Sequence, residues 1–337
     1  MSSGLRERII ELLREHQGSH IPQAYIHRAL GVSKSRVSEI LSELEREGLI
    51  SRTSIGRSKV IYVHPGISEK TTGVVRKNLR LGIVYSSEYL YLPWFIKKLA
   101  IRGYRVEVVV FRDGLKATRA LAEGVVDLAL SPLPGQLYMY PLYRTYKLIL
   151  AGVRGGFRVV YLGDSGPIYS SMISTMDYAR HRAVGLKMVD ADRTIYYGDP
   201  GELLRLKKSR GYIVTWHPVY YDLERRGFKS IYRPEDLDVQ FCCTLGVSNT
   251  VDDRSRGVIQ RDFQSALSSY EKTPERGLEY YASITGIDIA ILKTAVSEYS
   301  VVDGLSSSIV DELTSSFATL VPVRDVYRSA LLEENSV

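Results

Sequence analysis

Basic and hydroxyl side chains gather in a short segment near the N-terminus. They are Ser33, Lys34, Ser35, Arg36, Ser38, Arg52, Arg57 and Lys59. Lys and Arg neutralise phosphates, and Ser and Arg can hydrogen-bond to base edges, so the chemistry that fits this group is contact with double-stranded DNA. Residues 1–79 hold 13 Lys and Arg against 8 Asp and Glu, whereas the other 258 residues hold 32 against 30. The excess positive charge therefore lies where a polyanion would bind.

Polar and aromatic side chains form a second group, spread over the later chain. They are Tyr85, Ser86, Ser87, Tyr89, Ser131, Ser174, Thr175, Trp216 and His217. Ser174 and Thr175 stand at a predicted helix start, where hydroxyls and free N–H groups can bind an anion. A plain helix cap explains Ser174 equally well. Tyr85 and Trp216 offer flat surfaces for stacking. The group predicts a small effector that is anionic or planar aromatic.

Patterns typical of catalysis or metal binding are missing from the sequence. The six histidines show no zinc-binding spacing, and neither a P-loop nor a G-x-S-x-G elbow occurs. Cys242 and Cys243 are adjacent in an apolar run that resembles a strand. We therefore expect them to point to opposite faces, as two buried free thiols rather than a disulfide or a zinc site. These observations predict a protein that is not an enzyme and carries no cofactor or metal.

Composition is that of a soluble globular protein. The 337 residues are 45% hydrophobic and 25% charged, which suits two or three domains. No run approaches the roughly 18 apolar residues that span a bilayer. The opening residues MSSGLRERII lack the apolar core of a signal peptide. We expect a cytoplasmic protein without a membrane partner.

Two amphipathic helices and a hairpin must position the basic and hydroxyl residues between Ser33 and Lys59. Gly31 suits the left-handed end of one helix, and Ser33 can cap the next. The second helix should bury a stripe at helical spacing, namely Val37, Ile40, Leu41 and Leu44. The run SRTSIGRSKVIYV alternates like two short strands around a Gly56-Arg57 tip.

The run from Gly31-Val32-Ser33 through Leu44 to Gly48-Leu49-Ile50-Ser51-Arg52, with a basic hairpin after it, resembles the winged helix-turn-helix of MarR-like regulators. The resemblance implies a DNA-binding domain over residues 1–64, with the second helix as recognition helix. His27 departs from the motif, which usually has a small residue there. A small helical interaction module is the alternative interpretation. Because one such domain has a small footprint on DNA, we expect a homodimer.

Residues 65–79 read as a linker, because they contain Pro, Gly, Ser and Thr without a sustained apolar period. From residue 80, strands alternate with helices, which predicts an α/β domain over residues 80–337 with a mainly parallel sheet. We expect one lobe at about 80–153 and 245–337 and another at about 157–240. The glycine-rich residues 152–156 should form the hinge between them.

The segments RVEVVVFRDGLKATRALAEGVVDLALSPL and SALSSYEKTPERGLEYYASITGID resemble the type II periplasmic-binding-protein fold. Nitrate, taurine, sulfonate and thiamine-pyrimidine binders have this fold, and effector domains of LysR-type regulators share it. The resemblance implies a ligand in the crevice between two lobes, at the carboxyl ends of strands. We expect no export signal of the kind that this family carries, and the winged helix in its place favours sensing over transport.

The sequence thus predicts an α+β winged helix followed by an α/β two-lobe domain of the type II periplasmic-binding-protein class. The leading hypothesis is a one-component, ligand-responsive transcriptional regulator. A second hypothesis makes the two lobes only a dimerisation scaffold for a DNA-binding protein. A third is a thiamine-pyrimidine-synthesis-like enzyme, since one such enzyme family shares the fold, but Cys242-Cys243 alone does not match its cysteine-rich motif.

Overall fold

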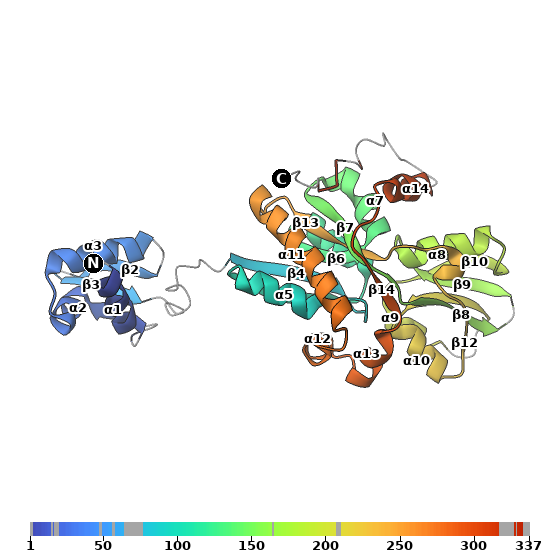
Figure 1. Ribbon diagram of the computed structural model, residues 1–337, viewed down its shortest axis with the longest axis horizontal. Helices are drawn as coiled ribbons and strands as arrows, with labels where there is room; N and C mark the ends of the chain where they lie inside the picture. Colours follow the sequence, from blue (N-terminus) through green and yellow to red (C-terminus); the bar gives the residue numbers. More distant parts are fainter. Residues whose placement is uncertain are drawn as a thin grey trace. The chain divides into compact units, whose positions relative to one another are not determined.

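The computed structural model describes residues 3–14, 16, 20–46, 49–55, 58–63, 77–163, 165–206, 210–316, 327 and 329–332. The chain divides into two compact units, Met1–Lys77 and Asn78–Val337, called unit 1 and unit 2 below. Figure 1 shows the elements of each. In the described part of the chain, no helix is long and apolar enough to cross a membrane.

Unit 1 is a small α/β unit. Its helices are α1 (Ser3–Arg14), α2 (Gln23–Leu30) and α3 (Lys34–Arg46), and its antiparallel sheet has the order β1 (His20–Pro22), β3 (Ser58–Val63), β2 (Ile50–Ile55). Gly31 ends α2 with φ of 65°, and the backbone N–H of Arg36 donates to Ser33 Oγ at 3.4 Å. The expected stripe on α3 is buried in the core of this unit: Val37, Ile40, Leu41 and Leu44. The helix turn and its cap are therefore formed by the residues that the sequence indicated.

The first lobe of unit 2 is built on a six-stranded sheet. Its order is β14 (Tyr299–Val302), β7 (Tyr146–Gly155), β13 (Cys243–Ser248), β6 (Leu128–Pro132), β4 (Lys77–Val84), β5 (Tyr104–Phe111). The helices of this lobe are α5 (Leu92–Ile101), α6 (Gly114–Ala122), α7 (Leu133–Tyr143), α11 (Asp253–Lys272), α12 (Leu278–Thr285), α13 (Ile289–Ala295) and α14 (Ser308–Ser316).

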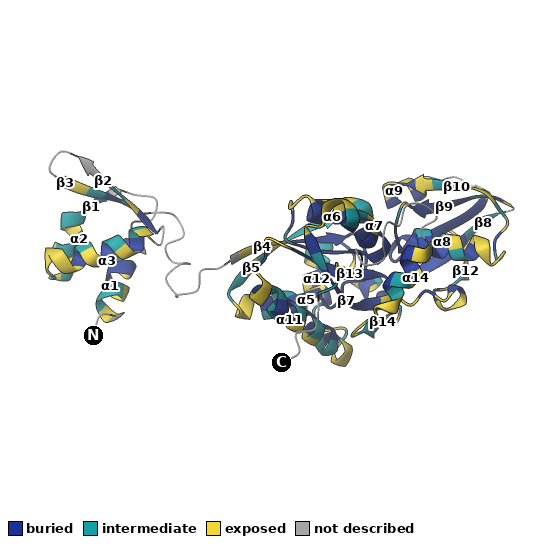
Figure 2. Cartoon of the chain, turned by 90° about the horizontal axis from the view of Figure 1, so that it is seen from above, coloured by how far each residue is buried: buried dark blue, intermediate teal, exposed yellow. Residues whose placement is uncertain are grey.

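The second lobe has a five-stranded sheet. Its order is β10 (Ala191–Tyr197), β9 (Gly166–Ser171), β11 (Gly211–Trp216), β8 (Phe157–Gly163), β12 (Lys229–Tyr232). With it go α8 (Thr175–Gly185), α9 (Pro200–Leu203), α10 (Val219–Arg225) and the 3-10 helix η1 (Glu235–Leu237). The chain passes between the lobes twice, outward from β7 to β8 and back from η1 to β13. Figure 2 shows buried residues along the strands of both lobes and exposed ones on the outer faces of helices such as α11.

Both sheets are mixed, so the expectation of a mainly parallel sheet is wrong. β4 pairs with β6, and β9 with β10 and β11, in parallel. By contrast β8 is antiparallel to β11 and β12, and β13 is antiparallel to β6 and β7. β8 and β13 are the strands that follow the two passages between lobes. A strand that enters from the other lobe has no preceding helix to return it in the parallel direction.

Other differences concern single elements. Helix α7 was not expected, because its sequence contains Pro134, Gly135 and Pro141. It forms nevertheless, with Leu133, Leu137 and Tyr140 among its buried residues, so tertiary packing outweighs its composition. Strand β4 begins at Lys77, inside the expected linker. Residues 65–76, which make up most of the expected linker, lie outside the described residues.

Candidate ligand site

A cavity of about 30 Å³ lies between the two lobes of unit 2. The first lobe contributes Val84, Ser86, Glu88, Tyr89, Gly114 and Pro132, and the second contributes Ser171, Ser174, Thr175, Met176 and Trp216. Cys242 and Cys243, on the returning passage, complete the wall. Strands β4, β6, β9 and β11 all end here, so the cavity occupies the carboxyl ends of strands from both sheets. Its volume has room for about two waters.

Glu88 provides the acidic group of the cavity. Only 4% of the surface of Glu88 is exposed to solvent. Oε1 accepts a hydrogen bond from the Cys243 backbone N–H at 2.9 Å, and Oε2 accepts one from the Cys242 thiol at 3.2 Å. Burial raises the pKa of Glu88 to about 7, against the opposing effect of these hydrogen bonds. Among the described residues that line the cavity there is no Lys or Arg, so the wall offers this carboxylate no counter-charge.

Two thiols lie beside this carboxyl group. Ligand atoms of Glu88, Cys242 and Cys243 are all within 4.8 Å of one another. Both cysteines are free and buried, and Cys243 Sγ accepts a hydrogen bond from the Tyr89 hydroxyl at 3.1 Å. Burial, followed by the neighbouring Cys242 thiol, raises the pKa of Cys243 well above its usual value. The expectation that the cysteines point to opposite faces is wrong, because β13 begins at Cys243 and strand alternation does not extend to Cys242.

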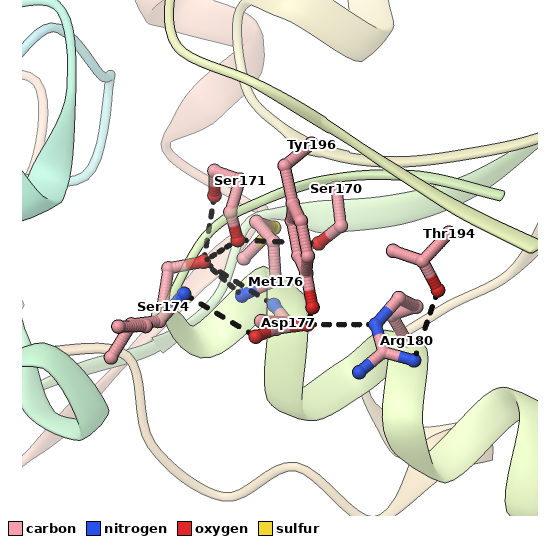
Figure 3. A network of polar contacts seen from close by, with 9 residues as sticks. Ser170, Ser171, Ser174, Met176, Asp177, Arg180, Thr194 and Tyr196 are labelled. Carbon is pink, nitrogen blue, oxygen red and sulfur yellow. Dashed lines mark hydrogen bonds and ion pairs between the residues drawn. The ribbon is translucent and has the colours of Figure 1, made fainter. Parts of the chain in front are cut away.

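Ser174 acts as the N-cap of α8, as Figure 3 shows. Its Oγ accepts hydrogen bonds from the backbone N–H groups of Met176 at 3.1 Å and Asp177 at 3.2 Å, and donates to the Ser171 carbonyl at 2.9 Å. Asp177 in the first helical turn accepts from Arg180 Nε at 2.7 Å. Its negative charge already occupies the positive end of the helix dipole. The capping interpretation of Ser174 is therefore confirmed, and this helix start offers little to an anion.

Only one of the two expected aromatic walls faces the cavity. Trp216 lines it, and its Nε1–H donates to the Tyr85 carbonyl at 2.8 Å, a hydrogen bond that joins the lobes. The ring of Tyr85 does not line the cavity; instead the Arg112 guanidinium carbon lies 4.2 Å from the ring centroid. The cation–π contact uses the ring face that was expected to meet a ligand.

The other expected ligand residues divide in the same way. Ser86, Tyr89, Ser174, Thr175 and Trp216 line the cavity, whereas Tyr85, Ser87, Ser131 and His217 do not. Ser131 Oγ accepts hydrogen bonds from the Thr118 hydroxyl and from Gln136 Nε2, each at 2.9 Å, inside the first lobe. Ser87 Oγ lies 2.8 Å from His217 Nδ1, so these two side chains satisfy each other.

His217 instead borders a second space, a polar cleft of about 570 Å³. There Arg158 pairs with Glu298, and its guanidinium carbon lies 4.8 Å from the centroid of the Tyr220 ring. Burial lowers the pKa of His217 to about 4. The charges of Arg158 and Glu298 neutralise each other, whereas the described residues in the wall of the smaller cavity offer Glu88 no cation.

The expected DNA-contacting residues of unit 1 differ in how far their side chains are exposed to solvent. Ser33, Lys34, Ser35, Arg36 and Lys59 are exposed, and Ser38 is half-buried. Arg52 differs from the expectation: its side chain is 17% exposed and forms hydrogen bonds to Glu45 Oε2 at 2.8 and 2.6 Å and to Ser42 Oγ at 3.0 Å. A guanidinium held by a carboxylate of α3 is not free for a phosphate. Arg57 lies outside the described residues.

The cavity is also lined by residues that were not predicted from the sequence as ligand residues, among them Glu88, Cys242, Cys243 and Met176. Glu88 stood inside the run of expected ligand residues from Ser86 to Tyr89, where its carboxyl group was a usable signal. The two cysteines of the sequence gave a weaker signal: they stand together at the point where the chain returns to the first lobe.

Comparisons with known proteins concern the two units separately. Residues 4–64 match the model of a family described as a domain of unknown function, DUF7343. No curated protein matches the chain.

Solved structures similar to this chain include a ligand-binding component of an ABC-type import system from Staphylococcus aureus with zinc bound. It is 17% identical over 71% of this chain and 90% of that chain, with a TM-score of 0.58. An alkanesulfonate-binding protein from Xanthomonas axonopodis pv. citri bound to MOPS is 14% identical over 71% and 90%, with a TM-score of 0.57. A Candida albicans protein with the generic periplasmic binding protein fold is 12% identical over 76% and 96%, also at 0.57. The chain therefore has a two-lobe fold like that of periplasmic binding proteins, preceded by a small α/β unit.

Proposed function

We propose that this chain is a one-component transcriptional regulator. Unit 1 binds double-stranded DNA, and unit 2 binds a small effector in the cavity between its lobes. The protein acts in the cytoplasm as a homodimer and catalyses no reaction. The observation that carries the proposal is the joining, in one chain, of a helix–turn–helix with an exposed basic end and a two-lobe fold of the periplasmic-binding-protein kind.

Unit 1 supports DNA binding through its element order and its surface. Helices α2 and α3 with the β2–β3 hairpin have the order of a winged helix, in which α3 is the recognition helix and the hairpin is the wing. Lys34, Ser35 and Arg36 are exposed in the first turn of α3. Recognition helices contact base edges with this end. Lys59 on β3 is exposed and adds a basic group to the wing.

Unit 2 supports effector binding through its cavity. An effector that touches both lobes changes their arrangement only if it binds one arrangement better than the other. Two contacts of second-lobe wall residues lie beside such an effector: Trp216 donates to the Tyr85 carbonyl of the first lobe, and Thr175 donates to the Cys242 carbonyl on the returning passage. An anionic effector fits poorly, because Glu88 lines the cavity without a cationic neighbour in the wall. We therefore propose a neutral or positively charged effector.

The scaffold hypothesis is the second candidate, and the small volume of the cavity favours it. The two candidates differ in one measurable respect. A scaffold predicts that no small molecule or ion alters the affinity of the full chain for DNA.

DNA binding is tested with the full chain and a pool of duplexes from which the preferred sequence is selected. Arg36→Ala should weaken binding to that sequence at least about fivefold, as expected for loss of a base-contacting arginine. Lys59→Ala should weaken all sequences alike and reduce the salt slope by about one unit. Arg46→Ala is the matched control, because it removes the same charge from an exposed position about 15 Å further along α3. Equal affinities for Arg36→Ala, Arg46→Ala and the unmodified chain would contradict the proposal.

A further inference from the structure

We infer that the cavity between the lobes binds a thiophilic divalent cation, of the class of Zn²⁺ and Cd²⁺, through Cys242, Cys243 and Glu88. The inference deepens the proposed function in one respect only, by making this cation the effector. The binding site itself depends on the side chains of unit 2 and on nothing in unit 1.

The spacing of the three groups suits one ion. Zn–S bonds of about 2.3 Å and Zn–O bonds of about 2.1 Å place the ligand atoms of a tetrahedral ion roughly 3.5 to 3.8 Å apart. Cys242 Sγ and Glu88 Oε2 are 3.2 Å apart, and all three ligand atoms lie within 4.8 Å of one another. Changes of about 1 Å or less in these separations would therefore complete the site.

The chemistry of the wall selects the class of ion. Thiolates favour soft and borderline cations over Mg²⁺ and Ca²⁺, which prefer sets of oxygen ligands. Binding forms two metal–sulfur bonds and one metal–oxygen bond, and the ion releases the water ligands that these groups replace. The two thiol protons and the proton of any protonated Glu88 carboxyl group pass to solvent, and no electrons are transferred. The ion also supplies the positive charge that the wall lacks beside Glu88. A cavity of about 30 Å³ accommodates an ion with one further small ligand, but not an organic molecule.

The position of the site explains how an ion could act on the lobes. Cys242 and Cys243 lie where the chain returns to the first lobe, and the Thr175 hydroxyl of the second lobe donates to the Cys242 carbonyl at 3.2 Å. Strand β7, which leads into the outward passage, is adjacent, since a Cβ at Gly152 would lie 2.5 Å from the Cys243 carbonyl oxygen. An ion held by Cys243 therefore restrains both passages between the lobes.

The test is a Cd²⁺ titration of the reduced full chain, followed by ultraviolet absorption from thiolate-to-metal charge transfer. The chain has only two cysteines, so the band reports this site and the six histidines cannot produce it. We expect saturation at one Cd²⁺ per chain, displacement by Zn²⁺ and no effect of Mg²⁺. The inference would be overturned if the band were absent, or if the band did not saturate near one Cd²⁺ per chain.

Variants assign the ligands. Cys242→Ser and Cys243→Ser should each reduce the band to about half or less and weaken Cd²⁺ binding at least tenfold, whereas Glu88→Gln should keep the band and weaken binding about tenfold. Ser170→Ala is the matched control, because this buried serine lies next to the cavity residue Ser171 but does not line the cavity. Wild-type Cd²⁺ affinity in all three ligand variants would refute the assignment. Should a cysteine variant fail to fold, X-ray absorption of the Zn²⁺-loaded wild-type chain must show two sulfur ligands for the inference to stand.

Measurements of DNA affinity with and without Zn²⁺ separate this inference from the proposed function. A chain that shows the Cd²⁺ band but binds no DNA supports the site and contradicts the regulator. A chain that binds DNA without showing the band contradicts the site and leaves the regulator standing. A Zn²⁺-dependent change in DNA affinity that is lost in Cys243→Ser supports both.

Discussion

The candidate DNA-binding surface of unit 1 holds exposed charged side chains, whereas unit 2 also holds several that are buried. In unit 1, Lys34, Arg36 and Lys59 are exposed to solvent. In unit 2, the side chains of Arg158 and Asp262 are 8% and 9% exposed, and Glu88 is 4% exposed. An exposed charge costs little and is available to a partner, whereas a buried charge is costly unless it is paired or neutralised. The surface of unit 1 therefore suits a charged macromolecule, and the interior of unit 2 suits a small ligand or ion.

Within unit 2 the buried charges themselves divide into two kinds. Arg158 is paired with Glu298, and Asp262 with Arg102 at 3.1 Å. Glu88 has thiol and backbone donors but no cation in its cavity wall, and burial raises its pKa to about 7. The paired groups are neutralised within the fold, whereas the carboxyl group without a counter-charge is the one at which we propose that a positive ligand binds.

The largest effect should come from breaking the buried pair. Arg158→Met leaves Glu298 without its partner and should lower the free energy of unfolding of unit 2 by about 4 kcal/mol. Urea unfolding followed by tryptophan fluorescence measures this, because Trp94 and Trp216 are the tryptophans of the chain and both lie in unit 2. Adding Glu298→Gln to Arg158→Met should restore part of the loss. A loss below about 1 kcal/mol would show that burial does not distinguish this pair from a surface pair.

His217 should produce the next effect, as a dependence of stability on pH. Burial lowers its pKa from 6.5 to about 4, so between these pH values the unfolded chain binds a proton that the folded chain does not. Stability should therefore fall as pH decreases from 6.5 towards 4, by about 3 kcal/mol at the lower end. The raised pKa of Glu88 works in the opposite direction over a similar range, so the measurement is the difference between the wild type and His217→Gln. A difference that does not change with pH would contradict the assignment.

The sequence predicted unit 1 better than the site in unit 2 for a physical reason. The core of α3 and the Gly31–Ser33 turn depend on neighbours within a few residues, which periodicity and capping rules describe. The cavity instead depends on contacts such as Glu88 with Cys242, which are 154 positions apart in the chain. Strand order and direction bring these together, and neither can be obtained from local patterns.

The same reason explains the errors at single residues. Tyr85 directly follows β4 and Ser131 lies near the end of β6, both at the expected edge. Their side chains contact Arg112 and Gln136 of other elements, and they do not line the cavity. Arg52 was expected on the surface. That prediction failed because strand alternation carries no information about the neighbouring helix α3, whose Glu45 binds the Arg52 side chain. Sequence patterns placed these residues on the correct elements, and tertiary contacts decided what their side chains bind.

A smaller effect should follow from removing the cap of α8. Ser174→Ala leaves the backbone N–H groups of Met176 and Asp177 without their acceptor and should cost about 1.5 kcal/mol of stability in unit 2. Because the hydroxyl is engaged in capping, Cd²⁺ affinity should change less than twofold. Thermal unfolding and the Cd²⁺ titration provide the two measurements. A tenfold loss of Cd²⁺ affinity would instead make Ser174 part of the ligand site.

The smallest effect should separate the two arginines of unit 1 that the sequence grouped together. Arg52→Ala removes a half-exposed ion pair with Glu45 and should lower local stability by up to about 1 kcal/mol. Hydrogen exchange of the β2 amides should then accelerate about fivefold, while DNA affinity changes less than twofold. Arg36→Ala should show the reverse, since its exposed side chain is available for DNA. If Arg52→Ala weakens DNA binding as much as Arg36→Ala without faster exchange, the guanidinium leaves Glu45 to contact DNA, and the distinction between exposed and engaged charges fails in unit 1.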